Sequence, residues 1–151
     1  MANPSTLTKI SASGKWESGV KTNIVIRNFK PFLMDEPVEL GGTDEGPNPM
    51  EFVLAALNGC NGVMIPLISK EINFSFSDIE FDSTGIIDIR GLSGVEGVSP
   101  HFQKVRFDVK ITTDESDERI QLLKENVEKR CPVYNLLKDA GTQIDATWKR
   151  A

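Results

Sequence analysis

Large apolar side chains recur throughout residues 49–70, and this pattern predicts one long helix. Asn48 is a good N-cap, Pro49 suits the first helical position, and Glu51 can reach back to the backbone N–H of the cap. The apolar side chains surround the axis, so we expect burial on every side. A sheet would cover one side of the helix, and a second copy of the chain would cover the other.

Small residues stand between the large side chains of this helix and would let a partner backbone approach closely. They are Ala55, Ala56, Asn58, Gly59, Asn61 and Gly62. Pro66 cannot donate a backbone hydrogen bond to the preceding turn, so a kink is expected there. The pattern therefore predicts a homodimer with this helix at its centre.

Alternation of apolar and polar residues predicts strands elsewhere in the chain. In "HFQKVRFDVKITT" the alternation is most regular, over residues 105–112, which indicates a sheet with one solvated face. Extended runs are also expected over "TLTKISAS" and "TNIVIRNF", separated by a turn at "SGKWESG", and over "FSDIEFDSTGIIDIRG". The segments "DEPVELGGTDEGPN" and "GLSGVEGVSP" are rich in turn residues and are predicted to be loops, the second one joining a hairpin.

The C-terminal third of the chain has the pattern of two helices and a closing strand. The first helix would start at Asp114 or Glu115 and carries an apolar stripe, and the second would start at Pro132 and end at Gly141. The segment "TQIDATWKR" alternates as a strand. The order of elements predicts an α+β fold in a single domain spanning residues 1–151.

Composition narrows the class of function. The formal net charge of −5 and the pI of about 4.9 argue against a nucleic-acid partner. The N-terminus lacks a secretory pattern, and we find no apolar run of roughly 18 residues, so we expect a cytoplasmic protein without a membrane partner. Two cysteines are present, Cys60 and Cys131, and in a reducing compartment their pairing would indicate redox chemistry.

Each cysteine has two interpretations. Cys60, in the middle of the apolar helix, is either an inert buried thiol or a reactive one. Cys131 directly precedes Pro132 and would occupy the cap of a short helix, where the dipole and free N–H groups favour a thiolate with a lowered pKa. The alternative for Cys131 is that any small residue fits before that proline.

The run "DEPVELGGTDEGPNPMEFVLAALNGC" and the later "RCPV" resemble the OsmC/Ohr family of thiol-dependent hydroperoxide reductases. The resemblance implies an OsmC-like fold, in which antiparallel sheets wrap a central buried helix, and an intertwined homodimer. It also implies that Cys60 is the peroxidatic cysteine and Cys131 the resolving one.

The same resemblance implies an enzyme of oxidative stress that reduces organic hydroperoxides. Such a peroxidase needs no metal or cofactor, but it needs an external thiol as electron donor. His101 stands alone in the sequence, without cysteine or acid at ligand spacing, so a metal site there is not expected. The alternative is a non-catalytic dimeric module of the same fold that binds a small ligand or senses redox state.

The charge partner of Cys60 is open. Peroxidases of this family use an arginine held by a glutamate, and Arg27 is the only arginine before the long helix, although it could equally face solvent. Met50 stands at the usual acid position, and Glu51 follows it. Nine residues separate Glu51 from Cys60, which places them on opposite helix faces, roughly 13 Å apart along the axis. Glu51 therefore either completes the helix cap or reaches the cysteine of a partner subunit.

Overall fold

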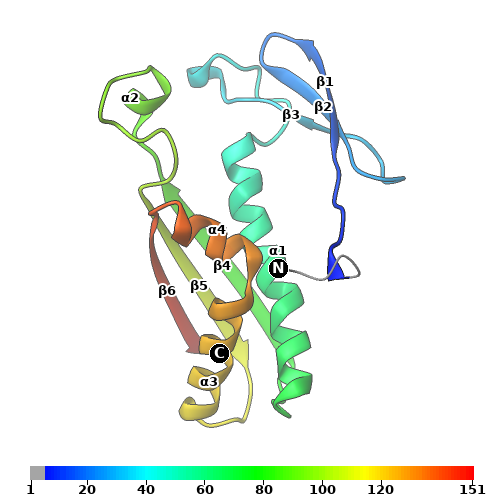
Figure 1. The fold of residues 1–151 in the computed structure, drawn as a ribbon, viewed down its shortest axis with the longest axis vertical. Helices are drawn as coiled ribbons and strands as arrows, with labels where there is room; N and C mark the ends of the chain where they lie inside the picture. Colours follow the sequence, from blue (N-terminus) through cyan, green and yellow to red (C-terminus); the bar gives the residue numbers. More distant parts are fainter. Residues whose placement is uncertain (1–5) are drawn as a thin grey trace. The chain divides into compact units, whose positions relative to one another are not determined.

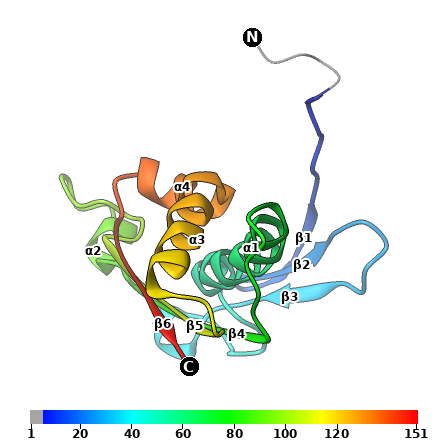
Figure 2. The same cartoon turned by 90° about the horizontal axis from the view of Figure 1, so that it is seen from below.

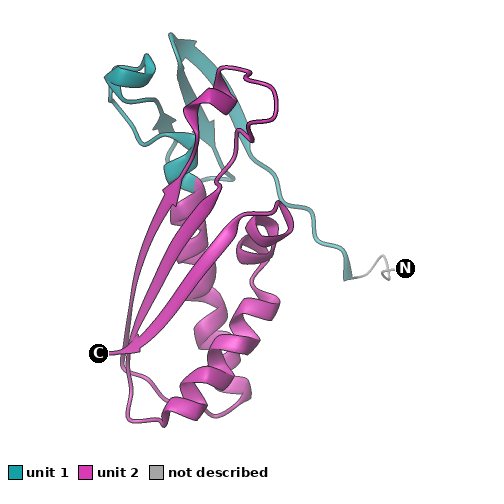
Figure 3. Cartoon of the chain, turned by 90° about the vertical axis from the view of Figure 1, so that its left-hand side faces the viewer, with its two compact units in different colours: residues 1–52 teal, residues 53–151 magenta. Residues whose placement is uncertain are grey.

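The computed structural model describes residues 6–151, and its contacts divide the chain into two units, Met1–Phe52 and Val53–Ala151 (Figure 3). The single domain expected over residues 1–151 stays a prediction.

The first unit contains an antiparallel sheet in the order β1-β2-β3. Its strands are β1 (Ser13–Ser18), β2 (Lys21–Val25) and β3 (Phe32–Met34). The segment expected to be a turn is therefore largely strand β1, and residues 7–12, expected to be extended, form no strand. The chain reverses later, at Gly19, whose φ of 54° suits glycine in a tight turn.

Asp35 organises the loop that joins β3 to the long helix. Its side chain is 1% exposed and accepts hydrogen bonds from the backbone N–H groups of Glu36, Thr43 and Glu45 and from the Thr43 hydroxyl. Burial opposes ionisation of Asp35, but these hydrogen bonds outweigh it and lower the pKa of the carboxyl to about 2. Within the loop, a short 3₁₀ turn, η2, spans Val38–Leu40.

Helix α1 (Pro49–Glu71) has the predicted start and length. Among the described residues it is the one helix long and apolar enough, by length and composition, to cross a membrane. The expectation that no segment reaches that length was therefore wrong. The core helix of a soluble protein passes the same test, so the absence of a membrane partner stays a prediction.

The second unit contains a sheet in the order β4-β5-β6 (Figure 1). Its strands are β4 (Asp78–Ile86), β5 (Lys104–Thr112) and β6 (Gln143–Arg150). Strands β4 and β5 are antiparallel, but β5 and β6 are parallel, which corrects the expectation of antiparallel sheets throughout. The parallel pair arises because the two helices after β5 carry the chain back to the end of the sheet where β5 begins, and β6 starts from there.

Three further helices belong to the second unit: α2 (Ile89–Leu92), α3 (Asp117–Arg130) and α4 (Pro132–Asp139). The short α2 lies in the connection between β4 and β5, where a strand end and a loop were expected. Helices α1 and α3 lie side by side on one face of the sheet (Figure 2). The other face of the sheet carries charged side chains, and these form ion pairs such as the one between Lys104 and Asp145.

The core of the second unit lies between the two helices and the sheet. Its members are the buried apolar side chains of α1, β5 and α3: Leu57, Ile65, Ile68, Val105, Phe107, Val109, Ile111, Ile120, Leu123 and Val127. Helix α1 is buried on this face alone, since Val63 is 65% and Leu67 is 47% exposed on the other side. The burial expected on every side is thus not provided by the single chain.

Candidate active site

The two cysteines of the chain meet in the second unit. Cys60 lies in the middle of α1 and is partly exposed. Cys131 ends α3 and starts α4, and its side chain is fully buried. The backbone N–H of Cys131 donates to the carbonyl of Val127, which closes α3, and Pro132 directly after it begins α4. The local sequence therefore fixes the Cys131 side chain at a helix junction facing α1.

The Sγ atoms of Cys60 and Cys131 lie 3.0 Å apart, and both cysteines are free thiols. A disulfide bond is about 2.05 Å long, so an approach of roughly 1 Å would join the two sulfurs. The residues are 71 positions apart in the sequence, and their contact depends on the packing of α3 and α4 beside α1. A dithiol in such contact can exchange two electrons by forming and breaking a disulfide.

The environment of Cys131 differs from the sequence prediction in one respect. Its sulfur caps α4 as expected and accepts a hydrogen bond from the backbone N–H of Tyr134, at 3.4 Å. However, burial, with a smaller effect from the hydrogen bond to Cys60, raises the pKa of the Cys131 thiol to about 11. The predicted lowering of this pKa was wrong, because the loss of solvent outweighs the helix cap.

Asn61, one of the small residues of the α1 sequence, also belongs to the site. It is 1% exposed, and its side-chain Nδ2 lies 3.0 Å from the carbonyl oxygen of Leu57 and 3.6 Å from the Cys131 sulfur. The signal in the sequence is an amide directly after Cys60 in a mainly apolar helix, because a buried amide needs hydrogen-bond partners.

Arg27 lies in the first unit, in the turn that follows β2 rather than in a strand. It has a positive φ of 50°, its side chain is exposed, and its guanidinium lies 4.6 Å from the centre of the Phe29 ring. This contact is a cation–π interaction. A role for Arg27 beside the Cys60 thiolate stays a prediction.

Glu51 completes the cap of α1. Its carboxylate accepts a hydrogen bond from the backbone N–H of Asn48 at 2.8 Å, and its own N–H donates to the Asn48 side chain at 2.8 Å. These reciprocal bonds form the capping box that was one of the two alternatives. Met50 precedes Glu51, at the position where the resemblance to the OsmC/Ohr family implies an acid. A contact of Glu51 with the cysteine of a partner subunit stays a prediction.

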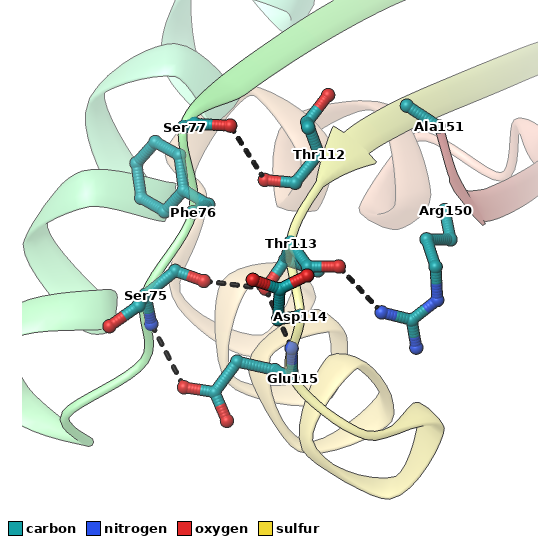
Figure 4. A pocket seen from close by; sticks show the side chains of 9 residues that line it. All are labelled: Ser75, Phe76, Ser77, Thr112, Thr113, Asp114, Glu115, Arg150 and Ala151. Carbon is teal, nitrogen blue, oxygen red and sulfur yellow. Dashed lines mark hydrogen bonds between the residues drawn. The ribbon is translucent and has the colours of Figure 1, made fainter.

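Polar groups of the second unit also gather away from the contact between Cys60 and Cys131. A surface pocket of about 620 Å³ lies where β5 and β6 end (Figure 4), and several of its lining groups bond to one another, as Thr113 does to Ser75. The Nδ1 atom of His101 lies 2.8 Å from the carbonyl oxygen of Phe102. Among the described residues, no group of three or more His, Cys, Asp or Glu side chains could hold a metal ion.

Comparison with known proteins identifies the family. A family model described as OsmC-like protein matches residues 42–147, a span that includes both Cys60 and Cys131. The chain belongs to the OsmC-like protein family. No curated protein sequence matches it.

Solved structures of OsmC-like proteins share the fold. An OsmC-like protein from Mycoplasma pneumoniae matches with a TM-score of 0.83 and 17% identity, covering 95% of this chain and 98% of that one. An organic hydroperoxide resistance protein from Elizabethkingia anophelis matches with a TM-score of 0.78 and 20% identity, covering 97% of this chain and 99% of that one. The organic hydroperoxide resistance protein OhrB of Bacillus subtilis matches with a TM-score of 0.64 and 18% identity, covering 95% of this chain and 98% of that one. The predicted family and the α+β OsmC-like fold are thus confirmed, and at these identities the likeness shows the fold alone.

Proposed function

We propose that this OsmC-like protein is a thiol-dependent peroxidase, an oxidoreductase that reduces organic hydroperoxides with Cys60 as peroxidatic and Cys131 as resolving cysteine. The observation that carries the proposal is the 3.0 Å contact between the two sulfurs. Structural neighbours described as organic hydroperoxide resistance proteins support the class of substrate. The proposal includes a cytoplasmic location and no cofactor.

The reaction balances with one peroxide and two external thiols per cycle. The Cys60 thiolate attacks the distal oxygen of the hydroperoxide, the O–O bond breaks, and the alkoxide takes up a proton and leaves as the alcohol. Cys60 is now a sulfenic acid. The Cys131 sulfur attacks the Cys60 sulfur, the S–O bond breaks, and hydroxide leaves with the Cys131 proton as water. Two thiols of an external donor then reduce the disulfide by exchange.

The environments of the two cysteines support this division of roles. Cys60 is partly exposed and can be reached by a peroxide, whereas Cys131 is fully buried behind it. The high pKa of Cys131, caused mainly by its burial, keeps that thiol neutral at pH 7, so it does not compete for the peroxide. Cys131 can therefore act once Cys60 has been oxidised.

The surface around Cys60 favours an organic peroxide. Ala56 and Val63 stand four residues before and three residues after Cys60, so they share its face of α1, and both are exposed. In the proposed homodimer, a second copy covers this face and gives Cys60 a dry, apolar surrounding. Arg27 is proposed as the positive charge that favours the Cys60 thiolate, because O–O cleavage leaves negative charge on the departing oxygen.

A peroxide-consumption assay tests the proposal. The reduced protein is mixed with cumene hydroperoxide and an excess of a dithiol reductant, and peroxide loss is followed over many turnovers. Wild type should consume the peroxide, and dimedone should trap a sulfenic acid on Cys60 in the Cys131→Ser variant. Consumption no faster in wild type than in Cys60→Ser would refute the proposal.

The same assay separates the alternative function. A ligand-binding or redox-sensing module would form the Cys60–Cys131 disulfide at most once and would not turn over with any thiol donor. The engagement of Glu51 in the helix cap is the observation that favours this alternative. A Met50→Glu variant with higher turnover than wild type would show that the missing acid limits the peroxidase.

A further inference from the structure

Asn61 is a buried polar side chain next to the reactive helix position, and its contacts are specific. A primary amide carries two N–H groups, and Asn61 directs its nitrogen toward two acceptors, the carbonyl oxygen of Leu57 at 3.0 Å and the sulfur of Cys131 at 3.6 Å. The bond to Leu57, one turn earlier in α1, fixes the orientation of the amide. Asn61 therefore presents a preoriented donor to Cys131.

The Cys131 sulfur also lies close to other groups, among them the backbone N–H of Val133. The backbone N–H of Tyr134 approaches it at 3.4 Å from α4, and the Cys60 sulfur lies at 3.0 Å. Two N–H groups from different helices thus point at the atom that would carry negative charge when the Cys131 thiol ionises. Hydrogen bonds to a charged acceptor are stronger than those to a neutral one, so both donors favour the thiolate.

We infer that Asn61 is a further catalytic residue, whose side-chain amide stabilises the Cys131 thiolate and holds its sulfur in line with Cys60 during disulfide formation. The inference rests on the proposed peroxidase function. It assigns Asn61 to the second step of the cycle and gives it no part in peroxide cleavage.

The second step needs such help because Cys131 is buried. A thiol with a pKa of about 11 is a thiolate in roughly one molecule in ten thousand at pH 7. In the step itself, the Cys131 proton leaves with the hydroxide released from the Cys60 sulfenic acid, and the S–S bond replaces the S–O bond. A donor that lowers the free energy of the thiolate raises the rate of this step without changing its stoichiometry.

Asn61→Leu tests the inference, because leucine has the same number and branching of side-chain heavy atoms as asparagine but no donor. One equivalent of cumene hydroperoxide is added to the reduced protein, samples are quenched in acid, and intact mass separates the sulfenic acid from the disulfide form. Peroxide loss should match wild type within about twofold, whereas disulfide formation should slow roughly tenfold and sulfenic acid should accumulate. The pH profile of disulfide formation should shift to higher pH, which a loss of packing alone would not cause.

The matched control is Asn126→Leu. Asn126 also donates its side-chain amide to a carbonyl one turn earlier, that of Leu122 at 2.9 Å, but it is half-buried and lies on α3 instead of beside Cys60 on α1. This control should form the disulfide at the wild-type rate. A folded Asn61→Leu variant with the wild-type rate and pH profile would overturn the inference, and Asn61→Ala replaces it if the leucine variant does not fold.

A second oxidant distinguishes failure of the inference from failure of the proposed function. Diamide oxidises a dithiol to a disulfide without a peroxide, by adding to one thiol and leaving when the other attacks. If wild type consumes no cumene hydroperoxide but Asn61→Leu slows the diamide reaction, the peroxidase proposal alone fails. If peroxide is consumed but Asn61→Leu changes neither reaction, the role of Asn61 alone fails.

Discussion

The exposed face of α1 makes the proposed homodimer testable with one substitution, Val63→Glu. Val63 is 65% exposed in the single chain, so a glutamate there should leave the core of the second unit intact. In a symmetric dimer the same face of both copies meets, and each copy brings the substituted residue to the interface. A folded chain that no longer pairs is therefore the expected result.

The magnitude follows from the area that pairing would cover. Complete burial of a valine or leucine side chain contributes about 1.5–3 kcal/mol. Val63 retains 65% of its exposure, so covering it contributes roughly 1–2 kcal/mol per copy and roughly 3 kcal/mol per dimer. The loss of this contribution corresponds to about a hundredfold rise in the dimer Kd, and a buried carboxylate in each copy raises it further.

Sedimentation equilibrium over a range of protein concentrations measures the effect, with circular dichroism as the test of folding. Leu122→Glu is the control, because Leu122 is an exposed leucine of α3, at 41%, outside the α1 face. We expect wild type and Leu122→Glu to have the mass of two copies and Val63→Glu that of one. A Val63→Glu protein that still pairs at micromolar concentration, or a wild type that never pairs, would refute the reasoning.

Three other predictions concern the stability of single units. The free energy of unfolding, measured with both thiols reduced, should fall from pH 9 to 11 by roughly 2 kcal/mol more in wild type than in Cys131→Ala, because the unfolded thiol ionises at lower pH than the buried one, whose pKa is about 11. Equal slopes would contradict the high pKa. Gly85→Ala should lower the free energy of unfolding in urea by about 1–3 kcal/mol, because the added Cβ would lie 2.1 Å from the Phe102 ring. An unchanged free energy of unfolding would show that the ring moves freely. Asp35→Asn should speed proteolysis within residues 36–48, because an amide nitrogen cannot accept the hydrogen bonds that order this loop, and an unchanged cleavage rate would show that they do not.

The best prediction from sequence was helix α1, because its signals are local. Asn48, Pro49 and Glu51 specify the start of the helix within one turn, and the structure has the capping bonds that this spacing implies. The strong alternation of β5 and the cap at Cys131 were predictable for the same reason. Each of these features depends on residues that are neighbours in the chain.

Features that depend on packing were not predictable. The parallel pairing of β6 with β5 follows from the path of α3 and α4, which no alternation pattern encodes. The high pKa of Cys131 follows from burial against α1, and the sequence offered only the helix cap that acts in the opposite direction. Asn61 was overlooked because its partner Cys131 is 70 positions away.

The helix cap that Glu51 forms limits the role that this carboxylate can have beside a cysteine. A carboxylate that accepts the N–H of Asn48 at 2.8 Å stabilises the start of α1, and moving it to a cysteine would leave that N–H without its partner. A shift of the acid to position 50 would change its direction by about 100° and release it from the cap. The family resemblance therefore identifies the two cysteines more strongly than their charge partner. The assignment of Arg27 as the cation that favours the Cys60 thiolate stays a proposal.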